Sequence, residues 1–270
     1  WQWQEKLVAL KPELDLSPLI DNLYRISSHE KLYRNFNITI DENGEAQYPI
    51  LLTNEEFTVE DKKVKKDKDT WCFPVCAYDS NLSGNDRAVF EYVKNNPDIK
   101  KVILTRHNKI ELTGQNVECY PLKSFEGQQA LLRSKVIFIK HSPMVNVPFP
   151  LDSSLHHFIN LWHGIPLKRI GCASLDLQHM LPKLTKENAR NSAVICSSDI
   201  DKLAMASAFT PLALDKMWLT GLPRIDTVLM DETELATDLV SELEFVKSQL
   251  KGRKLLFFCP TFKNGQGDSY

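Results

Sequence analysis

Residues 157–171 read His157-Phe158-Ile159-Asn160-Leu161-Trp162-His163-Gly164-Ile165-Pro166-Leu167-Lys168-Arg169-Ile170-Gly171. The apolar start predicts a short strand, and Pro166 predicts the first position of a helical turn, where a missing N–H costs nothing. His163 then lies at the strand's end beside Gly164, where a ligand has room to approach helix-start N–H groups of the kind that bind phosphate. Taken alone, the stretch fits either a phosphate site or a core histidine followed by an ordinary strand-to-helix turn.

The chain around this stretch alternates apolar strands with amphipathic helices from residue 71 onward. Strands are predicted at 71–75, 101–105, 117–120, 135–139, 157–161, 193–196, 217–219 and 254–259. Helices are predicted at 86–95, 124–133, from 199 onward and at 231–250, where Asp231 is the expected N-cap and Gly252 the terminator. This alternation predicts an α/β domain with a mainly parallel sheet.

Residues 1–69 do not share that alternation, and we assign them to an N-terminal module or extension of uncertain fold. Two prolines, Pro12 and Pro18, divide the apolar positions of the first 32 residues into short predicted helices. A hairpin is predicted over 36–52, turning at Asn43-Gly44. The basic run at 62–68 is interpreted as a solvated linker.

Composition limits the classes of partner and the compartment. The chain has 270 residues, is 43% hydrophobic and carries 33 Lys and Arg against 35 Asp and Glu, which gives no electrostatic reason to expect a nucleic-acid partner. No apolar run approaches the roughly 18 residues needed to span a bilayer, and the amino terminus lacks a signal-peptide layout. A cytoplasmic location is therefore expected. The chain begins with Trp rather than Met, so we expect it to be part of a longer protein.

The sequence indicates neither a metal site nor a cofactor. The six cysteines form no C-x-x-C pair and lie mostly in apolar segments, which suits reduced thiols. His156 and His157 have no acidic or cysteine partner at ligand spacing. The motifs of dinucleotide oxidoreductases, P-loop enzymes, serine hydrolases and zinc proteases are all absent from the sequence.

Four predicted strands end in loops with related chemistry, at 162–168, 196–199, 220–226 and 259–263. In a parallel sheet these loops share the carboxyl edge, where α/β folds bind ligands. Each polar residue also has an ordinary structural explanation: a helix N-cap, a surface pair between Arg224 and Asp226, or a solvated lysine. The candidate catalytic residue is His163, and the candidate substrate- and phosphate-binding residues around it are Gly164, Lys168, Ser197, Ser198, Arg224, Asp226, Thr261 and Lys263.

The same loops, in order, resemble the motifs of a known family. The motifs are the 161–171 stretch, Ser197-Ser198 followed by Phe209, Gly221-Leu222-Pro223-Arg224-Ile225-Asp226 and Cys259-Pro260-Thr261-Phe262-Lys263. With the helix at 85–93, they are similar to the CDP-glycerol glycerophosphotransferases, which include the teichoic acid and teichoic-acid-like capsule polymerases and primases of bacteria. The resemblance covers about residues 70–270, and Ile165 stands where the family more often has a small polar residue.

The resemblance implies a GT-B-like architecture of two Rossmann-like domains. Residues 70–250 would form the acceptor-side domain and 251–270 the start of the nucleotide-binding domain, whose remainder is absent. The donor would be CDP-glycerol or a related CDP-polyol, and the acceptor a polyol-phosphate or glycan chain. Acceptors of this family are made at the cytoplasmic face of the membrane, so the resemblance also implies peripheral membrane contact, and no nucleic acid.

The resemblance further implies a role for His163. A neutral His163 would take the proton from the acceptor hydroxyl as that oxygen attacks the β-phosphorus of CDP-glycerol and releases CMP. The N–H groups after Gly164, with Lys168 and Arg224, would stabilise the phosphoryl charge. Two alternatives remain open: a GT-B glycosyltransferase that uses a nucleotide sugar, and a non-catalytic acceptor-binding module.

Overall fold

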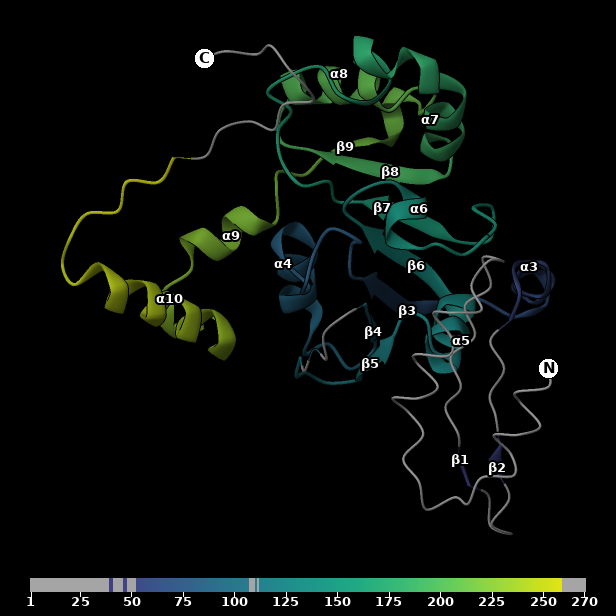
Figure 1. Ribbon diagram of the computed structural model, residues 1–270, viewed down its shortest axis with the longest axis horizontal. Helices are drawn as coiled ribbons and strands as arrows, with labels where there is room; N and C mark the ends of the chain where they lie inside the picture. The colour runs from purple at the N-terminus through teal and green to yellow at the C-terminus, as the bar shows by residue number, and fades with distance from the viewer. Residues whose placement is uncertain (1–38, 41–45, 48–51, 107–109, 111, 259–270) are drawn as a thin grey trace, which may run out of the picture.

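The computed structural model describes residues 39–40, 46–47, 52–106, 110 and 112–258 (Figure 1). In the amino-terminal part, β1 (Thr39–Ile40) pairs antiparallel with β2 (Ala46–Gln47), as the predicted hairpin requires. The turn of that hairpin and the short helices predicted before it lie outside the described residues. So do Cys259, Thr261 and Lys263 of the last predicted loop.

The predicted α/β domain is confirmed as a seven-stranded parallel sheet with the strand order β5-β4-β3-β6-β7-β8-β9. Every neighbouring pair in it runs parallel. The strands predicted between residues 71 and 219 are all present, with small changes at their ends. They are β3 (Asp67–Pro74), β4 (Lys100–Thr105), β5 (Val117–Pro121), β6 (Ser134–Ile139), β7 (His157–Asn160), β8 (Asn191–Cys196) and β9 (Met217–Leu219).

The direction in which successive strands are added to the sheet reverses at the boundary between β3 and β6. From β3 the chain builds outward through β4 and β5, then returns to the other side of β3 and builds through β6, β7, β8 and β9. Such a reversal leaves a crevice at the carboxyl ends of the strands, where open α/β sheets bind ligands. The loops after β3, β6 and β7 therefore surround the expected binding edge.

Helices cover both faces of the sheet (Figure 1). Alternate residues of β3 point to opposite faces, so Cys72 packs in one cluster with Phe57 and Phe73 in another with Phe90. Complete burial of each phenylalanine contributes roughly 1.5–3 kcal/mol. The helices are α3 (Asn54–Lys63), α4 (Gly84–Val93), α5 (Phe125–Arg133), α6 (Pro143–Asn146), α7 (Leu181–Asn188), α8 (Asp199–Ala208), α9 (Arg224–Leu229) and α10 (Thr237–Leu250), with 3₁₀ turns η1 (Gly171–Ala173), η2 (Leu175–Met180), η3 (Leu214–Lys216) and η4 (Glu232–Glu234).

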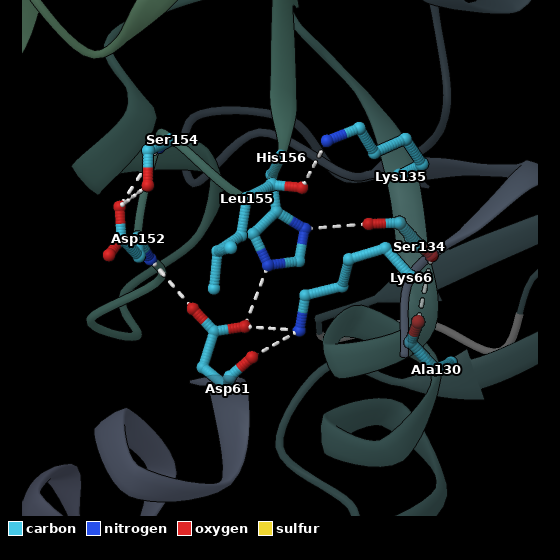
Figure 2. A network of polar contacts seen from close by, with 9 residues as sticks. All are labelled: Asp61, Lys66, Ala130, Ser134, Lys135, Asp152, Ser154, Leu155 and His156. Carbon is cyan, nitrogen blue, oxygen red and sulfur yellow. Dashed lines mark hydrogen bonds and ion pairs between the residues drawn. The ribbon is translucent and has the colours of Figure 1, made fainter. Parts of the chain in front are cut away.

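A buried polar network fixes α3 to the amino ends of β6 and β7 (Figure 2). One carboxylate oxygen of Asp61 lies 2.7 Å from both Lys66 Nζ and His156 Nε2, and the other accepts from the Asp152 N–H at 2.7 Å. The second ring nitrogen of His156 lies 2.6 Å from the Ser134 carbonyl oxygen. Lys66 therefore departs from the solvated-linker interpretation, because its side chain is only 9% exposed.

Two predicted elements are wrong near the carboxyl end of the described chain. The helix expected over 231–250 is split, because Asp231 and Glu234 close a capping box around η4, after which Leu235 and Ala236 adopt extended backbone before α10. The strand expected from residue 254 is absent over 254–258, where Leu256 is 95% exposed. A strand needs a hydrogen-bonded neighbour, and among the described residues none lies beside this segment.

Within the part of the chain that the structure describes, no helix combines the length and the apolar character that crossing a bilayer requires.

Candidate active site

His163 lies in the loop that follows β7, at the carboxyl edge of the sheet. The helical turn predicted at Pro166 does not form: residues 161–170 are irregular, and the next helical element is η1. The reason is a left-handed turn at Trp162, whose φ is 48°. That turn redirects the chain before any helix begins, so the expected helix-start phosphate site is also absent there.

Two buried asparagines hold this turn in place. Asn160, the last residue of β7, accepts the Trp162 N–H at 3.0 Å and donates to the His141 carbonyl at 2.9 Å. From α4, Asn85 donates to the carbonyl oxygens of Leu161 at 2.7 Å and Trp162 at 3.2 Å. Because both amides are almost fully buried, the backbone around His163 has little freedom to move.

The His163 ring is held by aromatic contacts. It stacks on Trp162 with ring centroids 4.1 Å apart, and Trp162 packs edge-on against Phe209 of the α8 region at 5.1 Å. The His141 ring lies beside this pair, with its centroid 5.6 Å from that of Trp162 and 5.8 Å from that of His163, and its plane is inclined by 22° to the His163 ring. No described residue hydrogen-bonds to the His163 ring, so its nitrogens are open to a substrate.

Its surroundings keep His163 uncharged. Although the residue is exposed overall, its stacked ring loses contact with water. This desolvation, together with the positive charges of Lys140 and Arg224, lowers the His163 pKa to about 4, and Asp79 opposes the shift. At neutral pH the imidazole is therefore neutral and has a lone pair to accept a proton.

A buried charge cluster lies at the ends of β3 and β6, beside the histidines. Lys140 Nζ pairs with Asp79 at 2.5 Å and donates to both the carbonyl and the hydroxyl oxygen of Ser83 at 2.9 Å. Asp86, at the start of α4, is 1% exposed and neither carboxylate oxygen accepts a hydrogen bond from a described residue. Burial therefore raises the Asp86 pKa to about 7, although Lys140 opposes the shift.

Arg224 and Gly164 are brought to the same place. The Arg224 backbone N–H bonds to Asn85 at 3.2 Å, and its guanidinium donates to the His163 carbonyl oxygen at 2.8 Å. A Cβ atom on Gly164 would lie 3.4 Å from that guanidinium, which is about van der Waals contact. Among the described ion pairs none joins Arg224 to Asp226, so the surface-pair alternative is not seen.

The other predicted residues lie farther from this cluster or have local structural roles. Ser198 caps α8 by accepting the Asp201 N–H, and the Ser197 hydroxyl donates to the Asp201 carboxylate. Ser197 and Asp226 line a pocket of about 560 Å³ together with Ile165. Lys168 is exposed on the loop, and Thr261 and Lys263 are not among the described residues.

Sequence reasoning missed four residues that form the site: Asn85, Lys140, His141 and Asn160. Lys140 and His141 directly follow the predicted strand 135–139, which is the same signal that identified His163 after 157–161. The two asparagines carried no such signal, because their role depends on carbonyl groups 76 and 19 positions away in the chain.

Within the described ranges, no group of three or more His, Cys, Asp and Glu side chains is arranged to hold a metal ion.

The chain is similar in sequence to one known family and in fold to solved structures. The profile of the family described as CDP-Glycerol:Poly(glycerophosphate) glycerophosphotransferase matches residues 57–269. No curated protein sequence matches the chain. The solved wall teichoic acid polymerase TagF is similar with a TM-score of 0.57 and 18% identity over 73% of this chain and 48% of that one. A TagF variant given a 30 minute CDPG soak is similar with a TM-score of 0.55 and 17% identity over 75% and 50%. The chain thus spans about half the length of these structures, and the likeness shows the shared α/β, GT-B-like fold.

Proposed function

The chain belongs to the CDP-glycerol:poly(glycerophosphate) glycerophosphotransferase family, and from that premise we propose that the protein transfers glycerol phosphate from CDP-glycerol to a hydroxyl of a growing teichoic-acid-like or capsule polymer. The observation that carries the proposal is His163: a neutral imidazole, open to substrate, at the carboxyl edge of the sheet. The alternative interpretation of this stretch was a core histidine, and a histidine buried in the core would be hydrogen-bonded within the fold.

The proposed chemistry is a phosphoryl substitution. The acceptor hydroxyl oxygen forms a bond to the β-phosphorus of CDP-glycerol while the bond from that phosphorus to the bridging oxygen breaks. CMP leaves with the bridging oxygen, and the hydroxyl proton passes to His163. General-base assistance of this kind is worth about 10²–10⁴-fold in rate. The Arg224 guanidinium, which donates to the His163 carbonyl oxygen at 2.8 Å, is our candidate to stabilise the developing phosphoryl charge.

We propose the finer assignments on the same basis. Gly164 and Arg224 contact the reacting phosphate, Ser197 and Asp226 contact the acceptor in the pocket beside Ile165, and Lys168 and Ser198 contribute polar contacts at its rim. Thr261 and Lys263 contact the donor. Residues 70–250 are the acceptor-side domain and 251–270 the start of the nucleotide-binding domain. The acceptor is a polyol-phosphate or glycan chain at the cytoplasmic face of the membrane.

A donor panel tests the reaction. We expect CMP release from CDP-glycerol with an oligo-glycerol-phosphate acceptor, and much slower turnover of CDP-ribitol and of UDP-sugars. The His163→Ala variant should fold, as judged by circular dichroism, yet release less than a tenth as much CMP as the wild type. Faster turnover of a UDP-sugar than of CDP-glycerol would instead identify a glycosyltransferase. Retention of more than a tenth of the activity by the variant would exclude His163 as the base.

A further inference from the structure

A second histidine, His141, shares the face of the site with His163 and has no assigned role. It follows β6, the strand beside β7, and its backbone is fixed at both ends: its N–H bonds to Asn146 at 3.1 Å and its carbonyl accepts from Asn160 at 2.9 Å. Both asparagines are 0% exposed. The residue is therefore held as firmly as His163 is.

The protonation state of His141 follows from one hydrogen bond. The Ser142 backbone N–H donates to Nδ1 of His141 at 2.9 Å. A backbone N–H only donates, so Nδ1 must carry the lone pair and the ring proton must reside on Nε2. Partial burial acts in the same direction, because it lowers the pKa of His141 and disfavours a second proton.

The remaining nitrogen of His141, Nε2, is a donor that no described residue pairs with. Among the described residues, no group hydrogen-bonds to Nε2. The ring is flanked by Tyr78, edge-on at 5.3 Å, and by His163, nearly parallel at 5.8 Å. A molecule that contacts the His163 ring therefore lies next to the His141 ring, which carries a fixed, uncharged N–H donor.

We propose that His141 is a second catalytic residue of this site, donating its Nε2–H to a non-bridging oxygen of the phosphoryl group under transfer. The inference rests on the proposed function and assigns a different chemical role to each of the two rings. His163, with open nitrogens, accepts the acceptor's proton, whereas His141, locked by Ser142, is only a donor. Negative charge spreads over the equatorial phosphoryl oxygens during the transfer, and a donor fixed in advance stabilises it without reorganisation.

Two substitutions separate a donor role from a structural one. His141→Asn places an oxygen near Nδ1, so it preserves the bond from Ser142 but has no donor at the Nε2 position. His141→Gln reaches farther and places an amide N–H near that position. His157→Gln is the matched control, because His157 is an exposed histidine at the other end of β7.

The expected result is a loss of about 10²-fold in kcat for His141→Asn, as for removal of one oxyanion donor, with an unchanged KM for CDP-glycerol. His141→Gln should recover at least tenfold of that loss, and His157→Gln should equal the wild type. The acid limb of the kcat/KM profile should persist in every His141 variant, because the base is unchanged. A loss below threefold for His141→Asn, equal losses for Asn and Gln, or disappearance of the acid limb would overturn the proposal.

Assays of the full chain distinguish a failure of the His141 role from a failure of the proposed function. An inactive His163→Ala variant beside an unaffected His141→Asn variant overturns only the role of His141. An active His163→Ala variant overturns the base assignment whatever His141 does.

Discussion

At the scale of single residues, the reactivity of the site depends on the protonation state of one imidazole. Removal of the His163 ring from water, with the positive charges of Lys140 and Arg224 nearby, holds its pKa at about 4. Such a base is fully available at neutral pH but is weak in the free protein. An anionic donor bound beside it favours the imidazolium form, so substrate binding strengthens the base.

The pH dependence of the rate tests this interpretation. Protonated His163 cannot accept a proton, so kcat/KM should fall as the pH drops toward 4, and the acid limb of kcat should lie at higher pH because donor is bound. Arg224→Gln removes one positive neighbour and should move the kcat/KM limb to higher pH. Arg169→Gln, an exposed change in the same loop, should leave it in place. A limb that moves to lower pH in Arg224→Gln would contradict the assigned cause.

At the scale of elements, ion pairs with at least one buried partner join two helices to the rest of the fold. The contact of α3 with the sheet depends on Asp61, which faces Lys66 and His156 (Figure 2). Hydrogen bonds from His156, Asp152 and Lys66 lower the pKa of Asp61 against the opposing effect of burial. The α10 contact with α4 depends instead on a bidentate pair between Arg87 and Asp238.

Asp61→Asn should destabilise the fold by about 3–5 kcal/mol, because it leaves the buried ammonium group of Lys66 without its counter-ion. Urea unfolding measures the loss. Glu60→Gln removes the neighbouring acid, which forms an exposed pair with Lys63, and should cost under about 0.5 kcal/mol. Equal losses in the free energy of unfolding for the two variants would show that the buried network contributes no more to stability than the exposed pair.

The same carboxylate predicts an acid-sensitive stability. The Asp61 pKa in the fold is below its ordinary value of 3.8, so the unfolded chain binds the proton more readily. The contribution of Asp61 is therefore complete above pH 3.8 and is lost as the pH falls through the folded value. In Asp61→Asn this part of the acid dependence of urea unfolding should disappear.

Asp238→Asn should loosen α10 selectively. The variant leaves the buried guanidinium of Arg87 with Glu91 alone, and we expect amide exchange across α10 to rise about fivefold, which corresponds to about 1 kcal/mol. Glu232→Gln removes the exposed partner of Lys247 on α10 and serves as the control. Uniform exchange changes across the whole sheet would argue against a local role for the pair.

At the scale of the whole molecule, the site is an assembly of loops from strands on both sides of the reversal in strand order. The loop after β3 contributes Asp79, the loop after β6 contributes Lys140 and His141, and the loop after β7 contributes His163. One side chain, Asn160, joins two of these loops by hydrogen bonds to His141 and Trp162. The relative position of the two histidines is therefore a property of the sheet as a whole.

Asn160→Ala should reduce kcat by about 10²-fold, because a shift of about 1 Å in a catalytic group has effects of that size. It should also cost about 1–3 kcal/mol of stability, since buried groups lose their partner. Asn188→Ala removes another buried amide, which bonds to the carbonyl oxygens of Ala208 and Thr210. That variant should lose stability but keep its kcat. A full kcat in folded Asn160→Ala would refute the positioning role.

The sequence by itself determined the α/β class, the strands between residues 71 and 219, and His163 as the candidate base. These follow from local patterns: the period of apolar residues and the residue types that come directly after each strand. The sequence also predicts that His163 lies at the carboxyl edge of the sheet, because parallel strands place their carboxyl ends together.

Only the tertiary structure decided what surrounds His163. Pro166 predicts a helix by local rules, but Asn160 and Asn85, one from the adjoining strand and one from α4, hold Trp162 in a left-handed turn instead. The lowered pKa of His163 likewise depends on the desolvation of its ring and on charges brought from other strands and helices. Contacts between residues distant in the chain leave no periodic signal in the sequence, so the loop geometry and the charge state of the histidine emerge only when the sheet is assembled.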